Sequence, residues 1–369
     1  MELFPAQYYQ TVFLILTFVL TLSQSIVLAR QNGNSILYKN HNSDAISLFL
    51  VMFILVVGLR PIRGFGDTFL YAHLFGLYHD KAAYMLDGGG EWIFNNFMWY
   101  CSQVMSVHIF FLIIEILYVV PVIIACKRLC PKNVAVMMLF FVGAYSFFSY
   151  GTNGIRHGMA CSLVILALSY IEGDKFAKIK CAVLCFIAVN CHRSTALPIV
   201  AMLFVYFYRK PKAMFYFWIS SIAISYTIGG LLESLLTMLG FDDRMALYIG
   251  GQDSDDVMRQ FTQKGFRWDF LLYSSMPIWL GWYLIFKKKV YNSTYIILLG
   301  TYIYSNAFWV MVIRAAFSNR FAYLSWFLYP IVLAYPLLTL KIWPDQGKKT
   351  SQIMLAHIGF TIFMWMIGK

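Results

Sequence analysis

Charged residues are scarce in this chain. Only 12% of its 369 residues are charged, whereas 60% are hydrophobic, and a soluble globular protein has about 25% charged residues. This composition cannot supply the polar surface of the two soluble domains that the length would otherwise suggest, so water-soluble classes are excluded. The mean hydropathy of +0.66 indicates that lipid surrounds most of the chain.

Acidic residues are rarer than basic ones. The chain has 17 aspartates and glutamates against 29 lysines and arginines, which gives a net charge of +12. The basic residues occur in short clusters between apolar runs and not along one face of a folded domain, so they do not predict a nucleic-acid partner. Such clusters instead mark the sides of a membrane. We therefore expect membrane lipid, and no nucleic acid, among the partners.

Metal-site spacing, a leader cleavage site and internal repeats are all lacking. No histidine stands at zinc-ligand spacing from the cysteine pairs Cys126/Cys130 and Cys181/Cys185, so neither a metal nor a cofactor is predicted. The first apolar run has no small-residue cleavage site and is followed by Arg30, which indicates a retained helix. Because no repeat or low-complexity linker is visible, we expect residues 1–369 to form a single transmembrane domain.

Long apolar runs are what this chain has in abundance. Many are apolar on every side and long enough to cross about 30 Å of hydrocarbon at about 1.5 Å per residue. They predict an all-α polytopic integral membrane protein with about twelve transmembrane helices. The expected ranges are 8–29, 44–59, 103–126, 133–150, 155–171, 179–191, 195–208, 213–239, 269–286, 290–313, 319–340 and 351–367.

Basic clusters fall on every second connection between these expected helices. Seventeen of the 29 lysines and arginines lie there, and the positive-inside rule assigns those connections to the cytoplasm and both termini to the outside. Two of the outside connections are long, near 60–102 and 240–268, and are expected to form external loops. The six basic clusters lie within 30–39, 127–132, 175–180, 209–212, 287–289 and 341–349.

Arginine is concentrated on the predicted outside. Nine of the twelve basic residues outside the clusters are arginines, whereas fourteen of the seventeen within the clusters are lysines. Topology requires only a positive charge, so the outer arginines need a separate explanation. Because a guanidinium binds phosphate or carboxylate through two parallel hydrogen bonds, the split predicts an anionic ligand at the outer face.

Two pairs of expected helices are shorter than the roughly 20 residues that a membrane crossing needs. One pair meets at 150–157 and the other at 190–194, which predicts two short broken hairpins. Non-helical backbone at membrane depth is tolerated only beside protein or water, so we expect both apices to line one wet recess. Arg156 and Arg193 stand at these apices. The alternative is that both arginines are membrane anchors that snorkel to the headgroups.

Four short motifs follow one another along the chain. They are Arg60 followed by Gly66-Asp67-Thr68 and Tyr71; Asn153-Gly154-Ile155-Arg156-His157-Gly158-Met159-Ala160; His192-Arg193-Ser194-Thr195-Ala196-Leu197; and Arg320-Phe321-Ala322-Tyr323. In this order, and on one predicted face of the membrane, they resemble the motifs of the EpsG/Wzy-like family of bacterial polysaccharide polymerases. The chain departs from the family pattern at His157, where glutamine is usual, and in one extra residue before the alanine of the third motif.

The resemblance implies a polysaccharide polymerase. Such an enzyme is a membrane glycosyltransferase that joins oligosaccharide repeat units carried on undecaprenyl diphosphate, in O-antigen, capsule or exopolysaccharide biosynthesis. The implied location is the bacterial cytoplasmic (inner) membrane, with the active site facing the periplasm or outside. The implied partners are the undecaprenyl-diphosphate-linked oligosaccharide, a chain-length regulator protein and a flippase.

The resemblance also implies roles for individual residues. Arg156 and Arg193 are expected to act in catalysis at the diphosphate. The base that deprotonates the acceptor hydroxyl is either Asp67 or His192, and the sequence leaves both open. Further residues expected to bind the diphosphate or the substrate are Arg60, Arg63, Tyr71, Asn153, His157, Arg267, Arg314, Arg320 and Tyr323.

Two other functions stay open at this point. A flippase for the same lipid-linked oligosaccharide, which is a transporter and not an enzyme, should carry cations in both halves of the membrane, whereas here arginine is concentrated outside. An O-antigen ligase, which joins finished chains to a lipid core, is not separated from a polymerase by the sequence.

Overall fold

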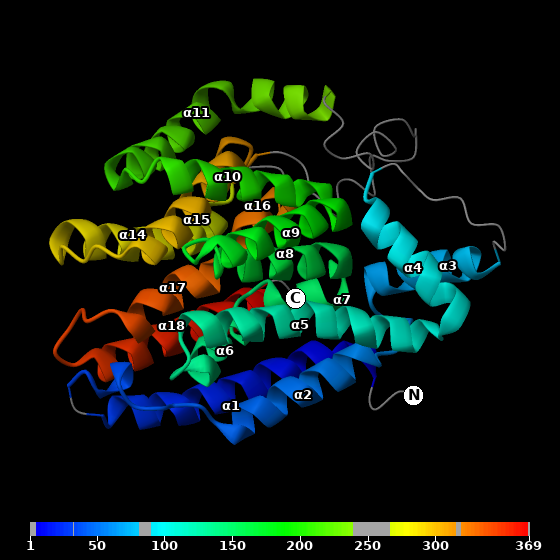
Figure 1. The fold of residues 1–369 in the computed structure, drawn as a ribbon, viewed down its shortest axis with the longest axis horizontal. Coiled ribbons are helices and arrows are strands. Elements are labelled where there is room, and N and C mark those ends of the chain that lie inside the picture. The colour runs from blue at the N-terminus through cyan, green and yellow to red at the C-terminus, as the bar shows by residue number, and fades with distance from the viewer. Residues whose placement is uncertain (1–4, 32, 81–89, 239–265, 315–318, 368–369) are drawn as a thin grey trace. The chain divides into compact units, whose positions relative to one another are not determined.

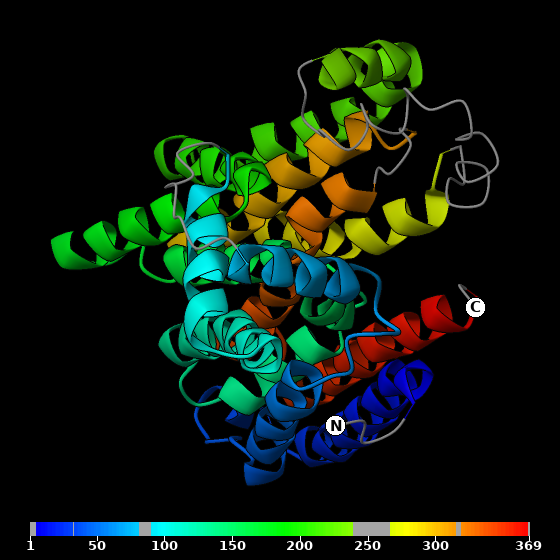
Figure 2. The same cartoon turned by 90° about the vertical axis from the view of Figure 1, so that its right-hand side faces the viewer.

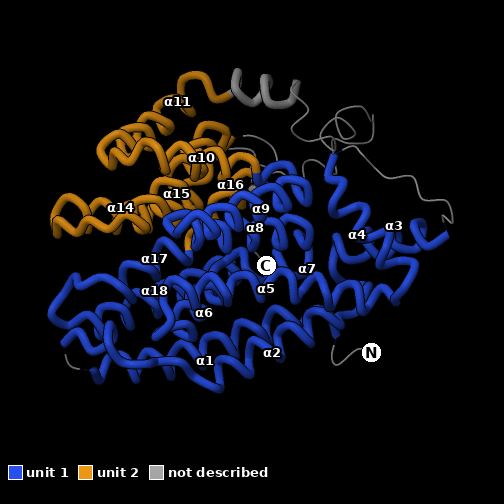
Figure 3. The backbone as a smooth tube through the Cα atoms, viewed as in Figure 1, with its two compact units in different colours: residues 1–195, 330–369 blue, residues 196–329 orange. Residues whose placement is uncertain are grey.

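The computed structural model describes residues 5–31, 33–80, 90–238, 266–314 and 319–367 (Figure 1). Helices joined by turns make up these ranges, and none of them contains a strand, which confirms the all-α prediction. The chain divides into two compact units (Figure 3): unit 1 comprises residues 1–195 and 330–369, and unit 2 comprises residues 196–329. The expectation of a single domain stays a prediction.

Unit 1 is built around the long apolar helix α5 (Val107–Leu129). This helix packs against α2 and α8, α8 packs against α9, and α4 contacts α3, α5 and α9. Helices α1 and α18 lie side by side in both views (Figure 1, Figure 2) and pack on α6. The remaining bounds are α1 (Tyr9–Ala29), α2 (Asp44–Gly58), α3 (Gly66–His79), α4 (Trp92–Val104), α6 (Val134–Val142), α7 (Phe147–Thr152), α8 (Ile155–Leu168), α9 (Lys175–Cys191), η3 (Arg193–Thr195), α17 (Tyr329–Thr339) and α18 (Gln346–Ile367).

Unit 2 is organised around α15 (Ser293–Met311), which packs against α10, α11, α14 and α16 among the described helices of this unit. Its residues are buried on nearly all sides, as expected for a helix that is hydrophobic all round. The surrounding elements are α10 (Ala196–Phe207), α11 (Pro211–Met238), α14 (Trp268–Trp282), the π-helix η4 (Tyr283–Lys287) and α16 (Asn319–Trp326).

Among the described residues, four segments are long and apolar enough to span a membrane, namely Ala6–Ala29, Val107–Leu129, Phe321–Thr339 and Gln346–Ile367. Three shorter apolar helices in the described residues are Asp44–Gly58, Ile155–Leu168 and Arg193–Phe207. These segments support an integral membrane protein, whereas the expected number of about twelve spans stays a prediction.

One expected span, 133–150, is broken into α6 and α7. The break frees backbone carbonyls, and α18 satisfies two of them: His357 Nε2 donates to the Phe140 carbonyl at 2.9 Å and Thr361 Oγ1 donates to the Gly143 carbonyl at 2.6 Å. Polar side chains from a neighbouring helix therefore allow the chain to interrupt a helix in an apolar environment. The apolar composition alone did not reveal this break.

The segment expected as the first external loop, 60–102, contains α3 and α4. Tyr71 and Phe75 on α3 and Phe94 and Met98 on α4 recur at helical spacing and are all buried in one cluster. The rings of Tyr71 and Phe94 meet edge-on at 5.8 Å. Aromatic stripes therefore fold this polar-looking connection into two packed helices. Most of the second expected loop, 240–268, lies outside the described residues.

Candidate active site

The carboxylate of Glu91 joins two of the sequence motifs in unit 1. Its Oε2 atom forms an ion pair with Nη1 of Arg156. Its Oε1 atom accepts hydrogen bonds from Nδ1 of His192 at 2.5 Å and from the backbone N–H of Arg193 at 3.1 Å. One side chain therefore holds the second and third motifs together.

The turn before α4 directs Glu91 toward these partners. Gly90 has a φ of +61°, a left-handed conformation that glycine adopts without the steric cost of a Cβ atom. Glu91 follows as the N-cap residue of α4, and its side chain makes no capping hydrogen bond to that helix. The carboxylate is thereby available for Arg156 and His192. A Cβ atom at Gly90 would lie 3.8 Å from Nη2 of Arg193, so this turn also borders the Arg193 guanidinium.

Arg156 is the second residue of α8, where the partial positive charge of a helix N-terminus disfavours a cation. The Glu91 carboxylate offsets both charges, and the Phe94 ring lies 5.8 Å from the guanidinium carbon. The Nε–H group of Arg156 is buried without a hydrogen-bond partner among the described residues. Arg156 therefore retains hydrogen-bonding capacity that Glu91 does not use.

His192 stands where helix α9 ends, as expected for the break at 190–194. Its φ of −153° and ψ of 109° are extended, and the short 3-10 helix η3 follows. The hydroxyl of Thr195 donates to the His192 carbonyl at 2.7 Å, which satisfies a group that the helix end leaves free. The break presents the half-buried His192 ring to Glu91 and leaves the Arg193 side chain exposed.

The pKa of Glu91 lies below its usual range. Burial alone would raise it, but the hydrogen bond and charge of His192, the charge of Arg156 and the Arg193 N–H together lower it more. Glu91 is therefore ionised at neutral pH and can only accept hydrogen bonds. Nδ1 of His192 must then carry a proton, so Nε2 is the acceptor in the tautomer that this hydrogen bond selects.

A second histidine adjoins this cluster. The ring centroid of His157 lies 4.7 Å from that of His192 and 5.3 Å from that of Tyr150. His157 follows Arg156 on α8, so the position where the family usually has glutamine contacts the third motif directly. The side chain of His157 is thus placed to orient His192.

Arg60 and Thr68 of the first motif contact Thr152, the residue just before the second motif. The Thr68 hydroxyl donates to the Thr152 carbonyl at 2.8 Å, and Arg60 donates from Nε to Thr68 Oγ1 at 2.9 Å. Arg60 also donates from Nη1 to the Val57 carbonyl at 2.7 Å and from Nη2 to the Thr152 carbonyl at 3.4 Å. Its guanidinium lies 4.9 Å from the Phe111 ring centroid.

Arg60 is fully buried, which differs from the substrate-binding role expected for it. Burial lowers its pKa to about 10, against the opposing charge of Glu115, so the guanidinium stays charged at neutral pH. Its donors are already directed at Val57, Thr68 and Thr152. The geometry supports a structural role that fixes the start of α8.

The other residues expected from the first two motifs lie in different settings. Tyr71 is buried against Phe94, which supports a packing role in place of the expected contact with substrate. Asp67 lies in the first turn of α3, and Arg63 just before that helix is exposed. A Cβ atom at Gly66 would lie 3.8 Å from Oδ1 of Asn153, so the exposed Asn153 side chain borders the start of α3.

The remaining expected residues belong to unit 2. Arg267 binds Asp269 through two hydrogen bonds of 2.9 and 2.6 Å, so its guanidinium is already paired within the chain. Arg314 is exposed and lies 4.7 Å from the Tyr226 ring centroid. Tyr323 packs against Trp326 at 5.6 Å between ring centroids. Arg320 lies in α16, and its side chain is outside the described part of the structure.

Glu91 is the residue that sequence reasoning missed. A signal was present, because Glu91 is an acidic residue between a run of glycines and an aromatic helix, in a connection that the sequence places on the arginine-rich side. A site of buried and half-buried cations needs a carboxylate to hold their positions. Within the described ranges no group of three or more histidine, cysteine or acidic residues could hold a metal ion.

Comparison with known families gives one match. The family model described as the EpsG family matches residues 45–369, a range that includes all four motifs and Glu91. Comparisons with curated proteins and with solved structures gave no match.

Proposed function

The chain belongs to the EpsG family, and on this basis we propose that it is a polysaccharide polymerase of the bacterial cytoplasmic membrane. It joins oligosaccharide repeat units carried on undecaprenyl diphosphate, with the active site facing the periplasm or outside. The observation that carries the proposal is the Glu91 carboxylate, which binds His192 and Arg156 at once. This arrangement combines a candidate base with cations suited to a diphosphate leaving group.

His192 is the base in this proposal. The acceptor sugar hydroxyl gives its proton to Nε2 of His192, while Glu91 holds the Nδ1–H group and stabilises the imidazolium that forms. The alternative base, Asp67, lies in the first turn of α3. His157, 4.7 Å from His192 between ring centroids, limits the orientations that the His192 ring can adopt.

The transfer replaces one carbon–oxygen bond by another. The deprotonated acceptor oxygen attacks the anomeric carbon of the donor sugar, the bond from that carbon to the diphosphate oxygen breaks, and undecaprenyl diphosphate leaves with the electron pair. Arg193 is exposed and the Arg156 side chain is 23% exposed, so both can bind the leaving oxygens. No ATP or nucleotide sugar is consumed, because the energy resides in the diphosphate bond.

Residues of the first motif stabilise the backbone that precedes Arg156. The hydrogen bonds from Arg60 and Thr68 fix Thr152, four residues before Arg156. A misplacement of about 1 Å in a catalytic group can cost about a hundredfold in rate. Buried support of this kind therefore matters to the reaction without contact with the substrate.

A reconstituted assay tests the proposal. The full chain in liposomes should convert an undecaprenyl-diphosphate-linked repeat unit into a ladder of longer products without nucleotide sugar or ATP. His192→Ala should leave only single units, and Lys348→Gln, an exposed change outside the motifs, should leave the ladder unchanged. A strict requirement for nucleotide sugar would assign the protein to another transferase class. Transbilayer movement of the lipid without a ladder would indicate a flippase, and transfer of finished chains to a lipid core would indicate a ligase.

A further inference from the structure

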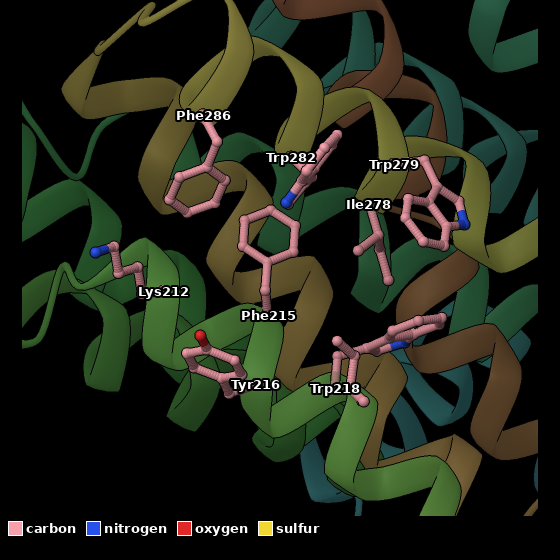
Figure 4. Close-up of a pocket in the computed structure, with 9 residues that line it drawn as sticks. Lys212, Phe215, Tyr216, Trp218, Ile278, Trp279, Trp282 and Phe286 are labelled. Carbon is pink, nitrogen blue, oxygen red and sulfur yellow. The ribbon is translucent and has the colours of Figure 1, made fainter.

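An apolar groove of about 350 Å³ lies within unit 2, between one face of α11 and one face of α14 with η4 (Figure 4). The lining residues on α11 recur every three or four positions, and so do those on α14 and η4. Each wall of the groove is therefore one face of a helix. The lining residues are Lys212, Phe215, Tyr216, Trp218, Ile219, Ile278, Trp279, Trp282 and Phe286.

The base of the groove is tightly packed. Both α11 and α14 pack on α15, and Trp218 Nε1 donates to Asn306 Oδ1 on α15 at 2.8 Å. A Cβ atom added at Gly281 would lie 2.5 Å from a methyl carbon of Leu299, so α14 approaches α15 as closely as a glycine permits. The groove is thus a preformed feature of this unit.

The two ends of the groove differ in chemistry. At one end Lys212 lies beside Phe215 and Phe286, whose ring centroids are 5.5 Å apart (Figure 4). The Nζ atom of Lys287 lies 5.6 Å from the centroid of the Trp282 ring, which lines the same groove. In the described part of the structure neither lysine forms an ion pair. The other end has only the apolar rings of Trp218 and Trp279 (Figure 4).

The lining of the groove suits a lipid chain. Apart from Lys212, its lining residues are apolar or aromatic, and an open apolar groove on a membrane protein meets hydrocarbon. The outer wall is open, since Tyr216 is 70% exposed and Trp279 is 57% exposed. An apolar slot with Lys212 in its lining and Lys287 beside the Trp282 ring is complementary to an anionic amphiphile.

We propose that this groove binds one anionic phospholipid of the membrane, with its phosphate at Lys212 and Lys287 and an acyl chain along Trp282 and Trp279. Both lysines belong to clusters that the positive-inside rule assigns to the cytoplasm, so the lipid comes from the cytoplasmic leaflet. The groove belongs to unit 2, whereas the residues assigned to transfer belong to unit 1, and the lipid serves to anchor unit 2.

Native mass spectrometry of the purified full chain tests this site. The protein is exchanged from detergent into mixtures of dioleoyl phosphatidylglycerol and dioleoyl phosphatidylcholine, and the lipid retained per chain is counted. Each lysine near an anionic surface contributes about a fivefold preference for the anionic lipid over the zwitterionic one. We expect one phosphatidylglycerol to be retained at least fivefold over phosphatidylcholine, and the double variant Lys212→Gln/Lys287→Gln to remove that preference.

Two further variants make the outcome decisive. Lys348→Gln/Lys349→Gln removes two exposed lysines of another predicted cytoplasmic cluster and should retain the preference. Ile219→Trp keeps both lysines but fills the slot and should lower retention. Equal retention of the two lipids, or unchanged retention in both groove variants, would overturn the proposal. Displacement of phosphatidylglycerol by equimolar undecaprenyl phosphate would also overturn it, because the occupant would then be the carrier lipid.

Discussion

His192 Nδ1 lies 2.5 Å from Glu91 Oε1, although the two residues are 101 positions apart in the chain. The contact unites the end of α9 with the start of α4, and the second carboxylate oxygen extends it to Arg156 on α8. Three helix ends therefore meet at one carboxylate. Because helix ends expose unpaired backbone groups, the carboxylate both stabilises the meeting point and organises its chemistry.

Replacing Glu91 by glutamine should lower polymer formation at least tenfold. Glutamine keeps the size of the side chain but removes the charge that stabilises the His192 imidazolium and holds Arg156. The measurement is the initial rate of ladder formation by purified protein in liposomes. Glu172→Gln, a change at an exposed acidic residue away from the cluster, is the matched control and should keep the wild-type rate. Equal rates for both variants would remove Glu91 from the site.

The depressed pKa of Glu91 predicts an acid-dependent loss of stability. A carboxyl group whose pKa is lower in the folded state stabilises the protein above its unfolded value of about 4.3, and this contribution is lost as the pH falls through the lower folded value. The melting temperature of the wild type should therefore exceed that of Glu91→Gln at pH 7, and the difference should shrink below about pH 4.3. Thermal unfolding in detergent between pH 3 and 7 measures it. A difference that stays constant over this range contradicts the charge network.

The sequence predicted the helical class, the turn before Arg156 and the break at His192, because apolar runs and polar interruptions are local signals. It did not predict that 60–102 contains α3 and α4, since the aromatic stripe that packs them is short and lies among polar residues. The break between α6 and α7 was also missed, because the His357 and Thr361 side chains that permit it come from the far end of the chain. Glu91 was missed for the same reason: its partners are distant in sequence.

Arg60 and Arg63 should respond in opposite ways to substitution. Arg60→Met removes three hydrogen bonds from a fully buried guanidinium, and we expect a loss of about 3 kcal/mol or more in the free energy of unfolding. Arg63→Met changes an exposed residue and should alter stability by less than about 0.5 kcal/mol. Melting temperatures of the two purified variants give the comparison. A stable Arg60→Met protein that no longer binds substrate would restore the binding role expected from the sequence.

The predicted sides of the membrane can be tested with single cysteines. Arg63→Cys stands on the predicted outside and Lys288→Cys on the predicted cytoplasmic side. Of the seven native cysteines, six are buried, so background labelling should be low. A membrane-impermeant maleimide applied to intact spheroplasts should label position 63 and not position 288, and both should react after lysis. Labelling at position 288 in intact cells would reverse the assignment of sides.

Conservative exchange of Arg156 and Arg193 separates catalysis from membrane anchoring. A lysine snorkels to the headgroups as readily as an arginine, so an anchoring role tolerates Arg156→Lys and Arg193→Lys. A role at the diphosphate does not, because lysine keeps the charge but loses the second aligned hydrogen bond. Each lost charged hydrogen bond costs about 1.5–3 kcal/mol, which corresponds to tenfold or more in rate.

The two arginines should also differ from one another. Arg156 is paired with Glu91, so its lysine variant should lower both the rate and the melting temperature, whereas the exposed Arg193 should affect the rate alone. Polymer length, initial rate and melting temperature are measured for each variant after normal membrane insertion has been verified, with Lys288→Arg as the control for the positive-inside signal. If both lysine variants make wild-type polymer at the wild-type rate, these arginines are anchors, and the site around Glu91 is not where the diphosphate binds.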